Sequence, residues 1–206
     1  MKTQESGISK FDFLFLIPGI ATGMAIAKVL QFFGEILAYH PNESPALLHD
    51  VWLIALVIFI LQHWFFILDW RAKEVIATFK QYLLSFLFPA GTYVMSVLLC
   101  PSHDEEVFGR LKNLLADRGH LIYLAAGLTM LIAAVEGEFI EKKAGLKFAY
   151  PGENFVRILF GFLFIVLGMI RCEWTQYAAV GLLVVAGIFR WLMAIWYVKP
   201  ARNLTR

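Results

Sequence analysis

Charged residues are scarce in this chain of 206 amino acids. They make up 17% of it, while hydrophobic residues make up 60%; a soluble domain is closer to a quarter charged and half apolar. A soluble fold could not hide so much apolar surface without associating. A net charge of only +2, with no basic run interleaved with aromatic residues, also excludes a nucleic-acid-binding protein.

The chain also lacks the short motifs that mark catalytic and cofactor sites. It has no Walker loop, no HExxH or GxSxG sequence, no pair of CxxC motifs and no filter sequence of potassium channels. We therefore expect no enzyme activity, no cofactor and no bound metal. Histidines near the ends of apolar segments could bind a metal or sense acidity, but their spacing matches no closed motif. They are His40, His49, His103 and His120.

Long apolar segments are what the chain does have. A bilayer core needs about 20 mostly apolar residues per helix. Six segments of suitable length are separated by proline, glycine and polar residues. They are residues 11–37, 47–69, 79–100, 120–140, 154–171 and 174–198. The sequence thus predicts an all-α, polytopic membrane protein in which residues 1–206 form one transmembrane domain of six helices.

The connection after the third segment has a helical pattern of its own. Ser102 and Glu105 fit a capping box, apolar residues then recur at helical spacing, and Gly119 can end a helix. We expect a short amphipathic helix over about residues 103–118 that lies in the membrane interface. A solvated loop helix is the alternative.

Lysine and arginine are unevenly distributed between the two sides that six spans imply. The termini and the second and fourth loops carry twelve of them, and the remaining loops carry four. Because loops rich in these residues stay in the cytoplasm, both termini are predicted to be cytoplasmic. This orientation puts Cys100 and Cys172 at the outer ends of spans, where an oxidising compartment would permit a disulfide between them.

Polar side chains inside the spans are the best functional clue, because burying a charge in lipid is costly. In the first segment Lys28, Gln31 and Glu35 lie within about 60° of one another around the helix axis. That helix should therefore face protein or a water-filled space. His63 lies near the inner end of the second segment, and Arg157 is expected to snorkel to the interface.

Two further charges match in depth. At about 1.5 Å per residue, Glu136 and Arg190 each lie roughly 24 Å from the outer end of their span. An ion pair between them is predicted, which could serve transport or be purely structural. Together with Lys28, Gln31, Glu35 and His63, these two residues form the set expected to line a transport pathway.

The first two segments resemble a loosely defined group of uncharacterised bacterial polytopic membrane proteins. The resemblance rests on Gly23, Leu30 and Gly34, on His49-x-x-Trp52, and on the aromatic run from His63 to Phe66. It covers about a third of the chain. It implies a bacterial source, and hence the cytoplasmic (inner) membrane, but no mechanism, since the group has no known activity.

These features favour a small ion channel or solute transporter that uses the polar residues of the first helix. A six-helix chain encloses little space alone, so we expect a homo-oligomer in the lipid bilayer, acting on a small ion or solute. The main alternative is a membrane-embedded sensor or effector subunit that acts through protein partners without transport. A membrane enzyme acting on lipid ranks third, because no nucleophile and base are clustered.

Overall fold

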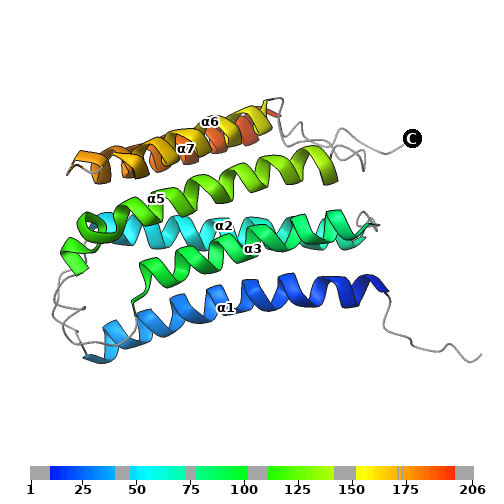
Figure 1. The fold of residues 1–206 in the computed structure, drawn as a ribbon, viewed down its shortest axis with the longest axis horizontal. Coiled ribbons are helices and arrows are strands. Elements are labelled where there is room, and N and C mark those ends of the chain that lie inside the picture. The colour runs from blue at the N-terminus through cyan, green and yellow to red at the C-terminus, as the bar shows by residue number, and fades with distance from the viewer. Residues whose placement is uncertain are drawn as a thin grey trace, which may run out of the picture.

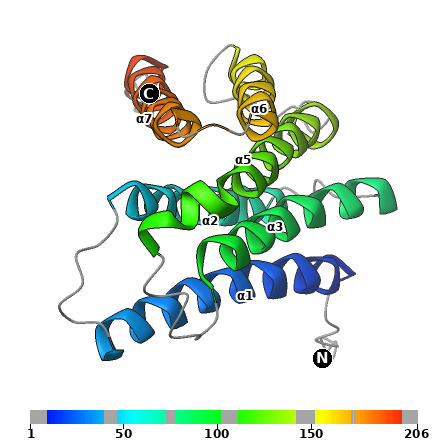
Figure 2. The ribbon, with the colours of Figure 1, turned by 60° about the vertical axis from the view of Figure 1, so that its left-hand side comes forward.

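The computed structural model describes residues 10–39, 47–72, 78–101, 111–141, 152–170, 172 and 174–197, and every regular element in these ranges is a helix. The elements are α1 (Lys10–Tyr39), α2 (Leu47–Ala72), α3 (Phe79–Leu99), α5 (Leu111–Glu136), the π-helix η1 (Gly137–Glu141), α6 (Glu153–Met169) and α7 (Trp174–Tyr197). The long helices lie in layers, with α6 and α7 on one side of α5, and α2 and α3 between α5 and α1 (Figures 1 and 2). The expected all-α fold is confirmed for the described residues.

A local sequence signal accounts for the start of α3, and two helices contain a proline. Thr78 caps α3: its hydroxyl accepts from the Gln81 backbone N–H, while the Gln81 side chain accepts from the Thr78 N–H. This is a capping box, which satisfies N–H groups that a helix start leaves free. Pro18 and Pro89 lie inside α1 and α3, and both helices continue through them.

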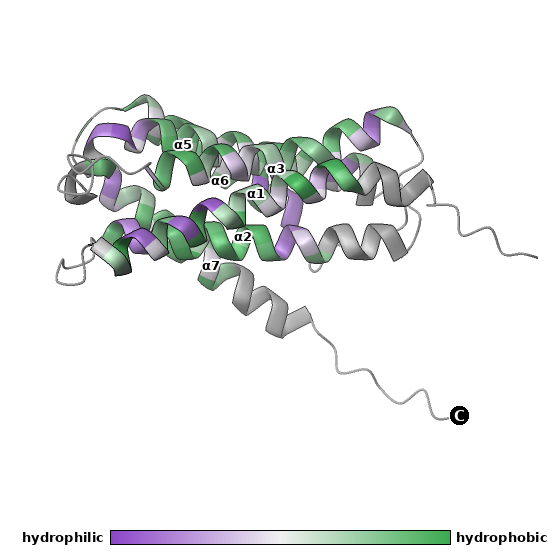
Figure 3. Ribbon diagram, turned by 90° about the horizontal axis from the view of Figure 1, so that it is seen from below, coloured by the Kyte–Doolittle hydropathy of each residue, from purple (hydrophilic) through white to green (hydrophobic). Residues whose placement is uncertain are grey.

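Among the described residues, four helices are long and apolar enough to cross a membrane. These windows are Leu16–Ile36, Leu48–Phe65, Phe79–Leu99 and Asp117–Phe139, and a shorter apolar helix covers Trp174–Phe189. Hydrophobic residues predominate along the helices (Figure 3). Many are exposed, such as Leu30 at 64% and Phe65 at 69%. A lipid environment accommodates such side chains, so the structure agrees with the membrane character expected from composition.

One predicted boundary is wrong. The helix expected to end at Gly119 does not, since α5 runs from Leu111 to Glu136 without interruption. Gly119 is buried, and a Cβ there would lie 2.7 Å from the Tyr123 hydroxyl. Residues 111–118 therefore continue directly into the fourth predicted span rather than forming a separate interfacial helix. Residues 102–110 lie outside the described part of the chain.

Glycines let α5 and α6 approach closely. A Cβ at Gly127 would lie 2.6 Å from the Gly161 backbone oxygen, and one at Gly168 would lie 2.9 Å from the His120 backbone oxygen. Small residues at such crossings are typical of helix packing in membranes, where backbones gain contacts by close approach. This tight pair forms one wall of the region described next.

Candidate functional site

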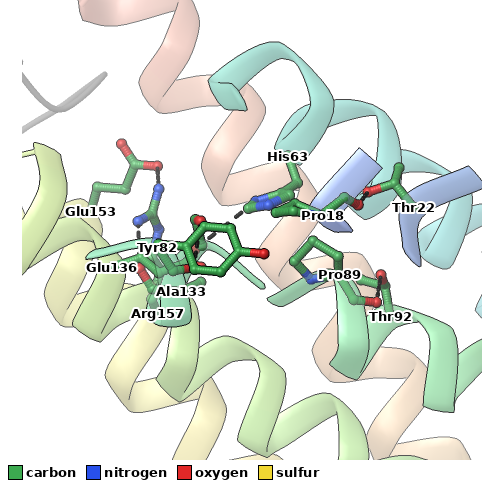
Figure 4. Close-up of polar contacts among 11 residues, drawn as sticks. Pro18, Thr22, His63, Tyr82, Pro89, Thr92, Ala133, Glu136, Glu153 and Arg157 are labelled. Atoms are coloured by element: carbon green, nitrogen blue, oxygen red, sulfur yellow. Dashed lines mark hydrogen bonds and ion pairs between the residues drawn. The ribbon is translucent and has the colours of Figure 1, made fainter. Parts of the chain in front are cut away.

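Four buried or half-buried polar side chains gather where α5 ends and α6 begins, beside the second half of α2. They are His63 on α2, Glu136 at the end of α5, and Glu153 and Arg157 in the first two turns of α6 (Figure 4). The two carboxylates and the imidazole are each less than 5% exposed. Burying ionisable groups costs free energy unless they interact with one another, so this gathering is a candidate site.

His63 connects three helices. Its Nδ1 lies 4.0 Å from the Glu136 Oε2, which joins α2 to α5. Its ring stacks on that of Phe88 in α3, with centroids 4.2 Å apart and planes inclined by 21°. The imidazole is thus fixed in orientation by an aromatic surface and faces a carboxylate.

Arg157 connects α6 to α5. Its Nη2 donates to the Glu153 Oε1 at 2.8 Å, one turn earlier on the same helix, and its Nη1 donates to the Ala133 carbonyl at 2.9 Å. Both bonds are charge-assisted on the guanidinium side, which makes them stronger than neutral ones. They hold the guanidinium at the site.

These polar groups border a cavity of about 190 Å³. Side chains from α2, α3, α5, α6 and α7 line it, and Gln62 and Thr129 add two uncharged polar groups. The rest of the wall is apolar and includes the rings of Phe59, Phe88 and Phe160. A mostly apolar pocket with a few converging polar groups is the usual form of a small-molecule site.

The first-helix residues lie elsewhere. Gln31 is exposed and donates to the Glu35 Oε1 at 2.7 Å, so this part of the expected polar stripe exists. Lys28 and Glu35 are half-buried. Lys28, Gln31 and Glu35 are not among the described residues that line the cavity. Their expected role in lining a transport pathway stays a prediction.

The predicted pair of Glu136 and Arg190 stays a prediction. Arg190 belongs to α7, but its side chain lies outside the described residues. In the described part of the chain, Glu136 contacts His63.

Arg157 and Glu153 are the site residues that sequence reasoning missed. Arg157 was expected to snorkel to the interface, but it is held inside the protein by two hydrogen bonds, and its side chain is only 14% exposed. The i, i+4 spacing of Glu153 and Arg157 was the available signal, because residues four apart face each other on a helix.

The disulfide expected between the two cysteines is not formed. Cys100 and Cys172, which are both described, are free thiols. Cys100 is fully buried after the end of α3, whereas Cys172 is exposed between α6 and α7. A thiol enclosed in the core does not reach one that faces outward.

His49, one of the histidines considered as a metal ligand or acid sensor, has contacts that explain it as a structural residue. It is 2% exposed, and its Nε2 lies 2.7 Å from the Leu99 carbonyl oxygen, which ties α2 to the end of α3. Its Nδ1 lies 3.8 Å from the neighbouring Asp50 carboxylate. Within the described ranges, no group of three His, Cys, Asp or Glu could hold a metal ion.

Comparison with known proteins gives no function for this site. No family model, curated protein or solved structure matches this chain. Any function must therefore be argued from the geometry of the cavity and its polar end.

Proposed function

We propose that this protein is a proton-coupled transporter of a small solute, and that the cavity between α2, α3, α5, α6 and α7 is its binding site. The observation that carries the proposal is the buried His63–Glu136 pair at the polar end of that cavity. Histidine and carboxylate side chains are the groups that proton relays inside membrane helices use. Ionisable groups inside membrane helices are characteristic of proton and substrate pathways.

The walls of the cavity indicate the kind of solute. Its volume of about 190 Å³ fits a small organic molecule, and its aromatic and aliphatic walls favour an apolar body. Gln62, Thr129 and the charged cluster offer hydrogen bonds to one polar end of that molecule. Binding at this end would change the environment of His63 and Glu136, which is how solute and proton movement would be coupled.

The proposal includes a topology. We infer six membrane spans, α1, α2, α3, α5, α6 and α7, with both termini in the cytoplasm and the polar end of the cavity in the cytoplasmic half of a bacterial inner membrane. Two observations support it. Four helices have the length and apolarity of spans, and α6, at 17 residues, covers about 25 Å, which is close to the bilayer core.

The test is solute-driven proton movement. Purified protein in liposomes that enclose a pH-sensitive dye would be screened with small amphipathic molecules, including amines, carboxylic acids and neutral alcohols. We expect at least one class to change the internal pH only when protein is present. We expect Glu136→Gln to abolish this coupling, because the glutamine amide neither binds nor releases a proton under these conditions.

Glu138→Gln is the matched control. Glu138 lies two residues further on in η1 and is exposed, with the Asn154 side chain donating to its Oε1 at 3.2 Å. This variant should transport as the unaltered protein does. Equal loss in both variants, or no proton movement with any solute class, would overturn the proposal.

A second candidate function is favoured by the outward face of α1. Gln31 and Glu35 form their hydrogen bond on an exposed part of that helix, and a Cβ at Gly23 or Gly34 would meet open space. Polar groups and small residues on an outward membrane face suit a neighbouring helix. A subunit that acts through partners, or a homo-oligomer of the transporter, would use this face. A stable complex with another protein, without any transport, would favour a subunit that acts through partners.

A further inference from the structure

A layer of buried side chains follows the cavity toward the end of the bundle that holds Cys172, where α6 ends and α2 and α5 begin (Figure 1). The residues that line the cavity include Ala55, Ala126 and Phe160, on α2, α5 and α6. Three or four residues nearer that end, and hence on the same face of each helix, an aromatic side chain follows. These side chains are Trp52, Tyr123 and Phe164, each at most 1% exposed.

The three aromatic side chains contact one another across three helices. The Trp52 ring stacks on that of Tyr123, with centroids 5.6 Å apart and planes inclined by 29°. It also meets the Phe164 ring edge to face, with centroids 5.6 Å apart and planes inclined by 64°. Trp52 on α2 is thus packed against both α5 and α6.

The other two walls of the cavity continue in the same way. Met95 lines the cavity from α3, and Leu99, four residues nearer the Cys172 end, is fully buried. Leu183 lines it from α7, and Ala179, again four residues nearer that end, is fully buried. All five helices around the cavity therefore contribute to one packed layer, which separates the cavity from this end of the bundle. This aromatic layer consists of Trp52, Leu99, Tyr123, Phe164 and Ala179.

Two polar atoms are enclosed in the aromatic layer. Within the described part of the chain, neither the Trp52 Nε1 nor the Tyr123 hydroxyl has a hydrogen-bond partner, and both are buried. The hydroxyl packs against the preceding turn of α5, since a Cβ at Gly119 would lie 2.7 Å from it. A buried polar group without a partner costs free energy, which contact with water would recover. The closed layer is therefore less stable than an apolar layer of the same shape.

We propose that the aromatic layer is a gate, which closes the cavity toward the Cys172 end of the bundle and opens to let water reach Trp52 and Tyr123. This inference rests on the proposed function, because a transporter exposes its binding site to each side of the membrane in turn. The two polar atoms keep the open state close in free energy to the closed one. The gate lies at the opposite end of the cavity from Glu136 and Glu153.

The experiment measures access to a cysteine in the cavity of the full-length protein in sealed membrane vesicles. Cys100→Ser and Cys172→Ser together remove both cysteines, and Thr129→Cys then places one in the cavity wall. A small charged methanethiosulfonate reagent is added from the side on which Cys172 of the unaltered protein reacts. Labelling is followed with time by mass spectrometry. We expect slow labelling, which Tyr123→Ala accelerates by leaving a gap in the layer.

Tyr123→Phe decides whether the layer acts as a gate. This change keeps the ring and its stacking on Trp52 but removes the hydroxyl without a partner. We expect the labelling rate to fall by about tenfold, because the closed state becomes more stable relative to the open one. The control is Tyr93→Phe, which removes the hydroxyl of a half-buried tyrosine of α3 outside the layer and should leave the rate unchanged.

Several results would overturn the inference. One is a rate with Tyr123→Phe that is unchanged, higher, or equal to that with Tyr93→Phe. Another is a cysteine at position 129 that is never labelled in the folded protein, or is labelled as fast as in unfolded protein.

The outcome is distinguishable from that of the proposed function, since labelling requires neither solute nor proton movement. Labelling that Tyr123→Phe slows, in a protein that transports nothing, contradicts only the transport proposal. Labelling that Tyr123→Phe does not slow, in an active transporter, contradicts only this inference.

Discussion

Arg157 donates a hydrogen bond from each of two guanidinium nitrogens, one to a side chain and one to the backbone. One goes to the Glu153 carboxylate at 2.8 Å and the other to the Ala133 carbonyl at 2.9 Å. Because Glu153 is 2% exposed, its charge is kept in the protein by this pairing rather than by water. The ion pair therefore fixes the start of α6 against the end of α5, next to His63 and Glu136.

This pairing predicts a large effect of a single substitution. Arg157→Ala should lower the free energy of unfolding by about 3 kcal/mol, since it leaves a buried carboxylate without its cation. Unfolding in mixed micelles with increasing SDS would measure it. The double variant Glu153→Gln with Arg157→Met should lose less than the single one, because neither charge then remains. A larger loss in the double variant would show that the pair does not act as described.

At the scale of helices, the glycines of the protein fall into two groups. Gly127 of α5 faces the backbone of Gly161 in α6, and a Cβ at Gly127 would lie 2.6 Å from the Gly161 backbone oxygen. Gly23 and Gly34 of α1 face open space. Glycine therefore permits close packing against another helix in α5. In α1 it lies on an outward surface that the described chain does not cover.

The two groups predict opposite outcomes for one substitution. Gly127→Ala should destabilise the protein by about 1–3 kcal/mol, because the Gly161 backbone cannot move aside without shifting α6. Gly23→Ala should be neutral or slightly stabilising for the isolated chain, since alanine favours the helix and meets nothing. Thermal unfolding of the two variants in the same detergent compares them. Equal melting temperatures would mean that α5 and α6 do not pack as closely as the structure has them.

Helix existence could be predicted from this sequence, but helix rotation could not. The apolar segments are long, so their number and approximate ends follow from bilayer thickness alone. Segments such as α2 and α5 are apolar all round, so no periodicity shows which face is inward. For that reason His63 and Glu136 were recognisable as candidates separately, while their contact was not. The predicted helix end at Gly119 was wrong because membrane helices tolerate glycines that would end a helix in water.

At the scale of the whole molecule, the two ends of the bundle differ in chemistry. One end holds the His63–Glu136 contact and the pair of Glu153 and Arg157 beside the cavity. Further along α2 and α5, Trp52 stacks on Tyr123 with centroids 5.6 Å apart, in an apolar and aromatic core. The buried charged groups beside the cavity suit a pathway that opens toward the side of the membrane on which they lie.

The cysteines allow this arrangement to be tested on the whole molecule. Cys172 is exposed and Cys100 is fully buried, and both are free. In the proposed topology, with both termini in the cytoplasm, the connection that holds Cys172 faces the outside. We therefore expect a membrane-impermeant maleimide, added to intact cells of the expression host with permeabilised outer membranes, to label the protein once.

Variants of the two cysteines identify the labelled residue and the side. Cys172→Ser should abolish labelling, whereas Cys100→Ser should leave it unchanged, because the Cys100 thiol becomes accessible only after unfolding in SDS. Labelling of Cys172 only in inside-out vesicles would reverse the proposed orientation and move the polar end of the cavity to the outer half of the membrane. Labelling that appears only after reduction, and a faster-migrating band without reductant, would instead show a disulfide between the two cysteines.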